Sequence, residues 1–445
     1  MKSRVALHSA TRQFRPILTA ISQTTVRPAL ATPHALKTYN LSPIDVYTPN
    51  TYTPLVLFFP SSSASHRVLV NKTNHIERLK HSLAQSLTTY YPFAGRMSSS
   101  GSRICCNDHG VQFLEAQVNC SMSEIIENRV KYNNKDDSFG FLFPPGTVWD
   151  ELNNNSSPLM VIQLNHFDCG GIAMAVSMTH KITDGYGICT FLEHWAAVSS
   201  QSGKQVQPYF LSWQSNDLPE NIPPPPKTKN VTRRFEFKNS SLTSMRAKIA
   251  KQGQLENPTR VELLTALLYR ASIAAASDCD STFTPSILIH LANVRSQLMI
   301  PMTAVGNHYW RYMVEVKNES EASLSLLMTQ IRRGKMELRA TEASKMNNAE
   351  NLIAPAYEYT KKGYKLYICS SLCNFPFHKV DFGWGKPSKV CIAEGACANH
   401  LIFTDTADGI EAMVCLEEDQ MLSFENNEEI LAAAYITDTN TATGV

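Results

Sequence analysis

The chain has almost no excess of charge of either sign. Its 445 residues include 41 Lys and Arg against 39 Asp and Glu, which gives a formal net charge of +2. Proteins that bind nucleic acid usually carry a basic patch. Here no cluster of lysine and arginine alternates with aromatic residues. We therefore expect no nucleic-acid partner.

Long hydrophobic runs are missing as well. The longest apolar stretches, such as Leu55–Phe59 and Gly170–Val176, fall far short of the ~20 residues that a helix needs to cross a bilayer. We expect no membrane partner. With 43% hydrophobic and 18% charged residues, the composition is ordinary for a soluble globular protein. A chain of 445 residues is too long for one ordinary core, which predicts two domains.

The cysteines do not form a disulfide pattern. There are 11 of them, an odd number, at irregular spacing and without a Cys-x-x-Cys pair. This usage predicts reduced thiols in a reducing compartment. No group of His, Cys and Asp has the spacing of metal ligands. We expect no metal and no permanently bound cofactor.

Acidic residues are absent from the first 44 positions, and Asp45 is the first carboxylate. The same segment is rich in arginine, serine and threonine, which is typical of an organelle transit peptide. The alternative is a plain extension on a cytoplasmic enzyme. We favour the extension, confined to residues 1–20, because Val26–His34 already has the character of a first strand region. The predicted location is cytoplasmic, with a plastid or mitochondrion as the alternative if residues 1–20 act as a transit peptide.

Segments with strand character alternate with segments of helical periodicity, which predicts an α/β fold. We also expect two hairpins. One lies within Arg103–Ala116 and has its turn at Asp108–Gly110. The other joins Leu159–Leu164 to Gly171–Met178.

A polar segment with a proline run divides the chain. Residues 199–230 are polar and include Pro223–Pro226. A proline run cannot donate backbone hydrogen bonds and stays extended. The predicted organisation is an extension at 1–20, an N-terminal domain at 21–198, a crossover linker at 199–230 and a C-terminal domain at 231–445.

The strongest catalytic candidate follows the second hairpin. The strand-like run Gly171–Thr179 ends at His180, with Asp184 and Gly185 just beyond it. An unperturbed imidazole titrates near ~6.5, so it can accept a proton at neutral pH. Taken alone, one histidine among 13 is more often a satisfied core residue than a base.

A second uncommon string changes that balance. Asp381-Phe-Gly-Trp-Gly-Lys-Pro387 stands far downstream of His180. Two further strings, Tyr91–Arg96 before His180 and Asn293–Ser296 after it, complete the order. Together these strings resemble the signatures of the plant BAHD acyl-CoA-dependent acyltransferases, over roughly residues 25–435. The sequence looks most like the vinorine synthase-like clade of alkaloid and terpenoid O-acetyltransferases.

The resemblance implies two α/β domains of similar size, both coenzyme A-dependent acyltransferase-like, with mixed sheets and a channel between them. His180 would lie at the centre of that channel as the general base. The co-substrate would be acyl-CoA, with acetyl-CoA as the expected donor, and the partner a small-molecule alcohol such as a terpenoid or alkaloid. Attack would be direct, in a ternary complex, and the protein would be a monomer.

The resemblance also assigns supporting roles. The family carboxylate that matches Asp184 points away from the acceptor and pairs with the arginine that matches Arg295. Asp184, Gly185 and Arg295 are therefore expected to hold the turn that aims His180. A buried carboxylate–guanidinium pair is geometrically strong, and losing one partner leaves an unpaired charge.

The downstream string is expected to be structural and to support the coenzyme A side. Glycines permit tight turns, and aromatic side chains supply bulk. The residues concerned are Asp381, Gly383, Trp384 and Gly385.

Ser370 is a candidate oxyanion contact. It begins the string Ser370–Cys373, which matches a family loop whose hydroxyl can face the developing oxyanion. Leu372 stands where that loop has a tryptophan, so no indole can contribute here.

Three alternatives compete with acetyl transfer catalysed by His180. One is a hydroxycinnamoyl or benzoyl-CoA transferase of the same fold. Another is a non-catalytic, ligand-binding relative, which the presence of His180, Asp184 and Arg295 disfavours. The last is an acyl-enzyme on Cys169 or Cys189, which would need a thiolate beside the imidazole, whereas buried structural thiols are far commoner.

Overall fold

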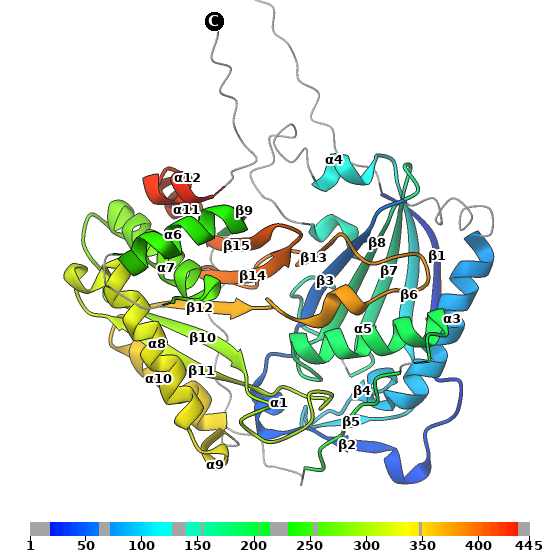
Figure 1. The fold of residues 1–445 in the computed structure, drawn as a ribbon. Helices are drawn as coiled ribbons and strands as arrows, with labels where there is room; N and C mark the ends of the chain where they lie inside the picture. The colour runs from blue at the N-terminus through cyan, green and yellow to red at the C-terminus, as the bar shows by residue number, and fades with distance from the viewer. Residues whose placement is uncertain are drawn as a thin grey trace, which may run out of the picture.

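The computed structural model describes residues 18–61, 72–126, 139–152, 155–203, 205–213, 230–251, 257–346 and 349–434. The chain forms two halves that lie side by side, each built on a six-stranded mixed sheet (Figure 1). Helices cover both sheets, so the expected α/β class is confirmed.

The first sheet has the strand order β1-β6-β7-β8-β3-β13. Its strands are β1 (Leu18–Val26), β6 (Val111–Val118), β7 (Met160–Phe167), β8 (Ile172–Thr179), β3 (Tyr52–Phe59) and β13 (Lys389–Ile392). β8 and β3 are buried along almost their whole length, because apolar side chains pack on both faces of the sheet.

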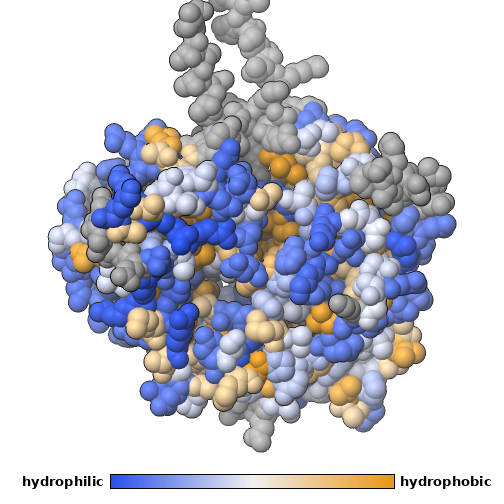
Figure 2. All heavy atoms as spheres, in the orientation of Figure 1, coloured by the Kyte–Doolittle hydropathy of each residue, from blue (hydrophilic) through white to orange (hydrophobic). Residues whose placement is uncertain are grey.

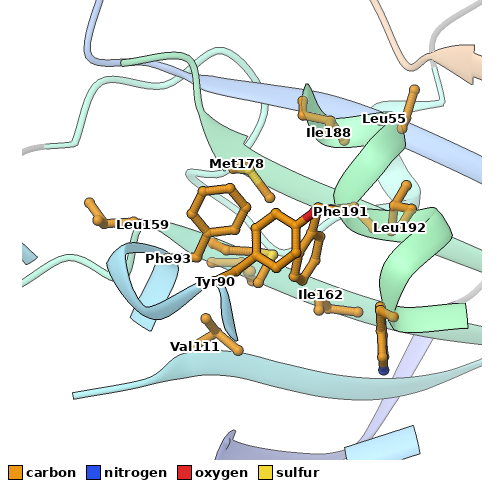
Figure 3. Close-up of a cluster of buried hydrophobic side chains, with 14 of the residues drawn as sticks. Leu55, Tyr90, Phe93, Val111, Leu159, Ile162, Met178, Ile188, Phe191 and Leu192 are labelled. Carbon is orange, nitrogen blue, oxygen red and sulfur yellow. The ribbon is translucent and has the colours of Figure 1, made fainter. Parts of the chain in front are cut away.

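Two helices, α3 (Lys72–Thr89) and α5 (Gly185–Ser200), pack on one face of this sheet. Figure 3 shows the cluster between α5, the sheet and the turn that carries Tyr90 and Phe93, where the rings of Tyr90, Phe93 and Phe191 pack against one another. A fully buried side chain of this size contributes ~1.5–3 kcal/mol relative to an exposed one. The cluster therefore holds the start of α5 firmly against the end of β8.

The second sheet has the strand order β11-β10-β12-β14-β15-β9. Its strands are β11 (Tyr309–Val316), β10 (Ser286–Asn293), β12 (Lys365–Ser371), β14 (His400–Thr406), β15 (Gly409–Glu417) and β9 (Asn230–Lys238). Its outer face packs against helices of the second half, whereas Ile402 of β14 and Met413 of β15 join the core of the first half.

A small three-stranded sheet and several helices complete the fold. The small sheet consists of β2 (Thr38–Asn40), β5 (Arg103–Cys105) and β4 (Arg96–Met97). The other helices are α1 (Pro43–Tyr47), α4 (Met122–Ile126), α6 (Asn239–Lys251), α7 (Arg260–Asp280), α8 (Leu324–Ala340), α9 (Ala343–Met346), α10 (Ala349–Lys361), α11 (Glu418–Glu425) and α12 (Glu428–Ala433). None of the helices that the structure describes is long and apolar enough to cross a membrane.

One strand does not follow the expected division at residue 230. β13 belongs to the C-terminal part of the chain but pairs antiparallel with β3, from Lys389 opposite Phe58 to Ile392 opposite Leu55. In Figure 1 the chain leaves β12, passes α5 and completes the first sheet before it returns as β14. The reason is that β3 is apolar along its length and would otherwise be an unpaired edge.

Two local expectations were wrong and one was right. The hairpin around Asp108–Gly110 does not form, because β5 pairs with β2 and β4 while β6 pairs with β1 and β7. The first strand is not at Val26–His34 but at Leu18–Val26, so the extension ends before Leu18. The hairpin of β7 and β8 is confirmed. Most of the crossover linker lies outside the described residues.

Candidate active site

His180 lies at the point where the central strand β8 ends. Its backbone N–H donates to the carbonyl of Thr51, next to β3, at 2.8 Å. The imidazole is partly exposed, and the Tyr309 ring stands edge-on to it with ring centroids 6.2 Å apart. A histidine fixed by a fully paired strand loses little entropy when it binds a reactant.

Asn307 determines which ring nitrogen of His180 is free. The Asn307 Nδ2 donates to the carbonyl of His180 at 2.7 Å and to Asp45 Oδ1 at 2.8 Å. Both partners are acceptors, so the amide orientation follows from the network. The remaining Oδ1 faces His180 Nδ1 at 3.1 Å and accepts a hydrogen bond from it. The hydrogen therefore sits on Nδ1, and Nε2 keeps an unshared lone pair.

Asp45 is a buried carboxylate behind Asn307, only 1% exposed. Its Oδ1 also accepts from the Asn307 backbone N–H at 2.7 Å, and its Oδ2 accepts from the Ser42 N–H at 2.9 Å. Burial raises the pKa of Asp45, and the nearby His308 and the Ser42 and Asn307 hydrogen bonds oppose that rise. Every hydrogen bond of the Asp45 carboxylate is one that it accepts, which suits the ionised form.

Asp184 has a different environment. Its two oxygens face Arg295 Nη1 at 2.8 Å and Nη2 at 2.9 Å, and Arg295 is fully buried. They also accept from the backbone N–H groups of Gly187 at 2.9 Å and His308 at 3.0 Å. Burial alone would raise the pKa of Asp184, but the Arg295 charge and hydrogen bonds outweigh burial and hold it below its usual range. None of the four bonds involves the His180 ring.

The sequence explains why Asp184 occupies that position. It is the N-cap residue of α5, and its side chain satisfies the Gly187 N–H that the helix leaves free. At Gly185, the next residue, a Cβ would lie 2.9 Å from Leu372 Cδ2, so any side chain there would require Leu372 to shift. The β12 loop of the second half thus packs directly on the first turn of α5.

The Asp381 segment forms a tight loop. Asp381 Oδ1 accepts from the N–H groups of Gly383 at 2.8 Å and Gly385 at 3.0 Å. Both glycines have positive φ, +96° and +110°, where other residues are strained. The carboxylate of Asp381 therefore stabilises the loop to which it belongs, through these two hydrogen bonds.

The aromatic residues of this loop attach it to the first half. Phe382 stands edge-on to Trp195 of α5, with ring centroids 4.8 Å apart. Trp384 stands edge-on to Phe59 of β3 at 5.8 Å. These contacts position β13 beside β3. A role on the coenzyme A side remains a prediction.

Two polar side chains of the second sheet lie on the face that meets the first half. Ser370 and Ile402 are opposite each other on β12 and β14, and His400 is two residues before Ile402. Neighbours in register and residues two apart share a face, and Ile402 packs in the core of the first half. Ser370 and His400 therefore face the same way. An oxyanion contact by Ser370 stays a prediction.

His400 stands out because it is 8% exposed and neither ring nitrogen has a hydrogen-bond partner among the described residues. Burial, together with the proximity of His180, lowers the pKa of His400 to about 4. The imidazole is thus neutral at physiological pH, with one donor and one acceptor free.

The thiols near His180 are poor nucleophiles. Cys189 is buried in α5, and burial raises the pKa of its thiol well above the usual range. Cys169 is exposed in the β7–β8 turn, at the opposite end of β8 from His180. The reactive form is the thiolate, so the geometry gives no support to an acyl-enzyme.

The described part of the chain contains no group of three or more His, Cys, Asp and Glu residues placed to hold a metal ion. Two residues of the site, Asp45 and Asn307, were not among those that the sequence predicted. Ser42 and Asp45 form a capping box at the start of α1, a local pattern visible in the sequence, but nothing local connects it to His180.

Comparisons with known proteins fit this geometry. The model of the Transferase family matches residues 17–431. A 17,18-epoxy-17-hydroxycur-19-ene N-malonyltransferase of Strychnos nux-vomica is 34% identical, over 93% of this chain and 90% of its own. A minovincinine 19-hydroxy-O-acetyltransferase of Catharanthus roseus is 31% identical, over 93% of this chain and 97% of its own.

The crystal structure of vinorine synthase superposes with a TM-score of 0.76 at 26% identity, over 94% of this chain and 98% of that one. The two mixed sheets and the paired halves are therefore an architecture that this chain shares with a solved member. From the matched length and these relatives, the chain belongs to the Transferase family of BAHD proteins and is an acyl-CoA-dependent acyltransferase.

Proposed function

We propose that the protein transfers an acetyl group from acetyl-CoA to a hydroxyl group of a plant specialised metabolite, with His180 as the general base. The observation that carries the base assignment is the tautomer: Nδ1–H of His180 donates a hydrogen bond to Asn307 Oδ1 and keeps its hydrogen, so the unprotonated Nε2 can accept a proton. A positioned base of this kind contributes ~10² to 10⁴ in rate.

The reaction is direct, in a ternary complex. The acceptor hydroxyl gives its proton to His180 Nε2 as its oxygen attacks the thioester carbonyl. The tetrahedral oxyanion then collapses, the carbon–sulfur bond breaks, and coenzyme A leaves as a thiolate. Nε2–H returns the proton to that sulfur, so His180 ends neutral. Ser370, on the same face of the second sheet as Ile402, is the proposed contact for the oxyanion.

Several observations support a catalytic enzyme over a non-catalytic relative. His180 keeps a free nitrogen, and the Asp184–Arg295 pair that supports its turn is intact. Acetyl is the proposed donor because the O-acetyltransferase relative resembles the chain over 93% of its length. The N-malonyltransferase relative makes malonyl-CoA the necessary comparison. We also propose a cytoplasmic monomer without a resident cofactor.

The test is release of coenzyme A thiol from purified protein. Acetyl-, malonyl-, benzoyl- and p-coumaroyl-CoA are each offered with a panel of terpenoid and alkaloid alcohols, and products are identified by mass spectrometry. Acetyl-CoA should give the highest kcat/KM. Preference for an aromatic acyl-CoA would overturn the donor assignment, and absence of acyl transfer from every donor would overturn the enzyme assignment.

A further inference from the structure

We propose that Asp45, and not the motif carboxylate Asp184, is the acidic group that assists His180, and that it acts through the side chain of Asn307. Asp45 is then a positioning residue, because it touches Asn307 and not the reactants. This inference rests on the proposed role of His180 as the base.

The first argument is the direction of the hydrogen bonds. Nδ1–H of His180 donates to Asn307 Oδ1, and Asn307 Nδ2–H donates onward to Asp45 Oδ1. If the amide were reversed, its oxygen would face the Asp45 carboxylate and the His180 carbonyl, which are both acceptors. Asp45 therefore prevents the flip. Without the flip, the proton stays on Nδ1 and Nε2 stays free.

The second argument is charge. Asp184 is neutralised by the bidentate Arg295 pair, whereas no Lys, Arg or His nitrogen lies within 4.0 Å of the Asp45 carboxylate in the described ranges. When His180 takes up a proton, the positive charge spreads to Nδ1. A negative group linked to Nδ1 by one polarisable amide, in surroundings that water does not reach, stabilises that charge.

Other titratable groups surround Asp45, and none of them cancels its charge by direct contact. Lys181 donates its ammonium to the carbonyl of Val46 in α1, and burial lowers the pKa of Lys181 to about 8, against the opposing influence of Asp45. His308 faces Asp45 beyond Gly306, and burial lowers the pKa of its imidazole. The neutral phenols of Tyr39 and Tyr309 complete the set.

The third argument is the placement of α1, which carries Asp45. Ile44 packs in the core of the second half, while Val46 packs in the core of the first half. Asn307, between β10 and β11, belongs to the second half, and His180 to the first. The relay of hydrogen bonds from His180 through Asn307 to Asp45 therefore forms only where the two halves and α1 meet. The tautomer of His180 is thus fixed once the two halves have packed together.

The experiment measures kcat, KM and the pH profile of kcat/KM for Asp45→Asn, which keeps the shape and removes the charge. Loss of a hydrogen-bonded supporting group of this kind typically costs ~10- to 100-fold. We expect that loss in kcat, with KM for both substrates within about 3-fold. The acidic limb of the profile should move to lower pH, because protonated His180 loses a favourable charge.

Glu262→Gln is the matched control. Glu262 is also a buried carboxylate in a capping box, at the start of α7, and it pairs with Lys335 and Arg332 far from His180. It should lower the melting temperature and leave kcat and the pH profile unchanged. A structural role for Asp45 would give the same result as this control, and that outcome would overturn the proposal.

Two further variants keep the outcomes separate. Asn307→Ala breaks the relay from the other side, so it should reproduce the loss in kcat and the shift of the acidic limb of the pH profile. This variant provides the test if Asp45→Asn does not fold. In the Asn307→Ala background, Asp45→Asn should cost little more. His180→Ala is measured in parallel. If it keeps turnover, the proposed function fails; if it loses turnover while Asp45→Asn and Asn307→Ala keep theirs, only the relay fails.

Discussion

His180 and Asp184 are four residues apart in the chain, but their side chains differ in how much of their hydrogen-bonding capacity is used. Both Asp184 oxygens accept two hydrogen bonds, and its charge is matched by Arg295. His180 uses one ring nitrogen and leaves the other free. A group whose hydrogen-bonding capacity is fully used holds structure, whereas a group with a free lone pair can take part in chemistry. Motif membership alone does not separate the two roles.

Exchanging His180 for alanine is the sharpest way to break this comparison. We expect turnover to fall by ~10² to 10⁴ because proton removal is lost. The melting temperature should change little, since the ring makes one side-chain hydrogen bond. Steady-state kinetics and thermal unfolding measure both. His109→Ala, which removes an exposed imidazole, is the control. Turnover within a few-fold of wild type would contradict the base assignment.

Removing Asp184 should have the opposite signature. Asp184→Ala leaves the Arg295 charge buried without a partner, at a cost of ~3–5 kcal/mol in the free energy of unfolding. Arg295→Ala should cost a similar amount, and the double variant should cost less than the sum. Denaturant unfolding gives these values. Arg333→Ala, which breaks an exposed pair with Glu337, should cost less than ~1 kcal/mol. Strict additivity at Asp184 and Arg295 would show that the pair is not coupled.

Gly185→Ala tests the contact that joins the two halves at this turn. The new methyl group would lie 2.9 Å from Leu372 Cδ2, and overpacking of this kind typically costs ~1–3 kcal/mol. Leu372→Ala loses its own packing against the core of the first half, but it also removes the clash, so the double variant should cost less than the sum of the two single variants. Thermal unfolding of the three variants measures this coupling. Strictly additive losses would mean that Leu372 is not the obstacle.

His400 gives the smallest effect at neutral pH and a distinct one in acid. Its pKa is lowered to about 4 in the folded chain, whereas an unfolded histidine titrates near ~6.5. Between these values the unfolded state binds more protons, so stability falls as pH falls. The His400→Leu variant should lack this part of the acid sensitivity. Denaturant unfolding at pH 7 and pH 5 measures it, and parallel loss in both proteins would refute a neutral, buried His400.

The sequence predicted the local structure around His180 better than the long-range contacts of the site. The run before His180 has strand character, and the structure confirms β8 and its hairpin with β7. The Asp184–Arg295 pair followed from the family resemblance and is present. Asp45 and Asn307 were not assigned roles, because they stand far from His180 in the sequence, Asn307 by 127 residues, and only tertiary packing brings the three together.

The same limit explains the errors in the fold. Asp108–Gly110 has good turn chemistry, yet β5 and β6 pair with other strands because tertiary partners override a local turn signal. The boundary at residue 230 missed β13 because its pairing with β3 spans more than 300 positions, from Lys389 to Phe58. Periodicity reports which face of a strand is buried, but not which sheet receives it.

The pairing of β13 with β3 has a consequence for synthesis on the ribosome. Chains emerge N-terminus first and tend to fold domain by domain, but here the first sheet stays one strand short until residue 392 has been made. Until then the apolar edge Tyr52–Phe59 faces the cytosol or a chaperone. A fragment that stops at residue 213 should therefore aggregate, and supplying residues 376–394 as a fused segment should restore soluble material. Dividing this enzyme at its linker would not yield two independent modules.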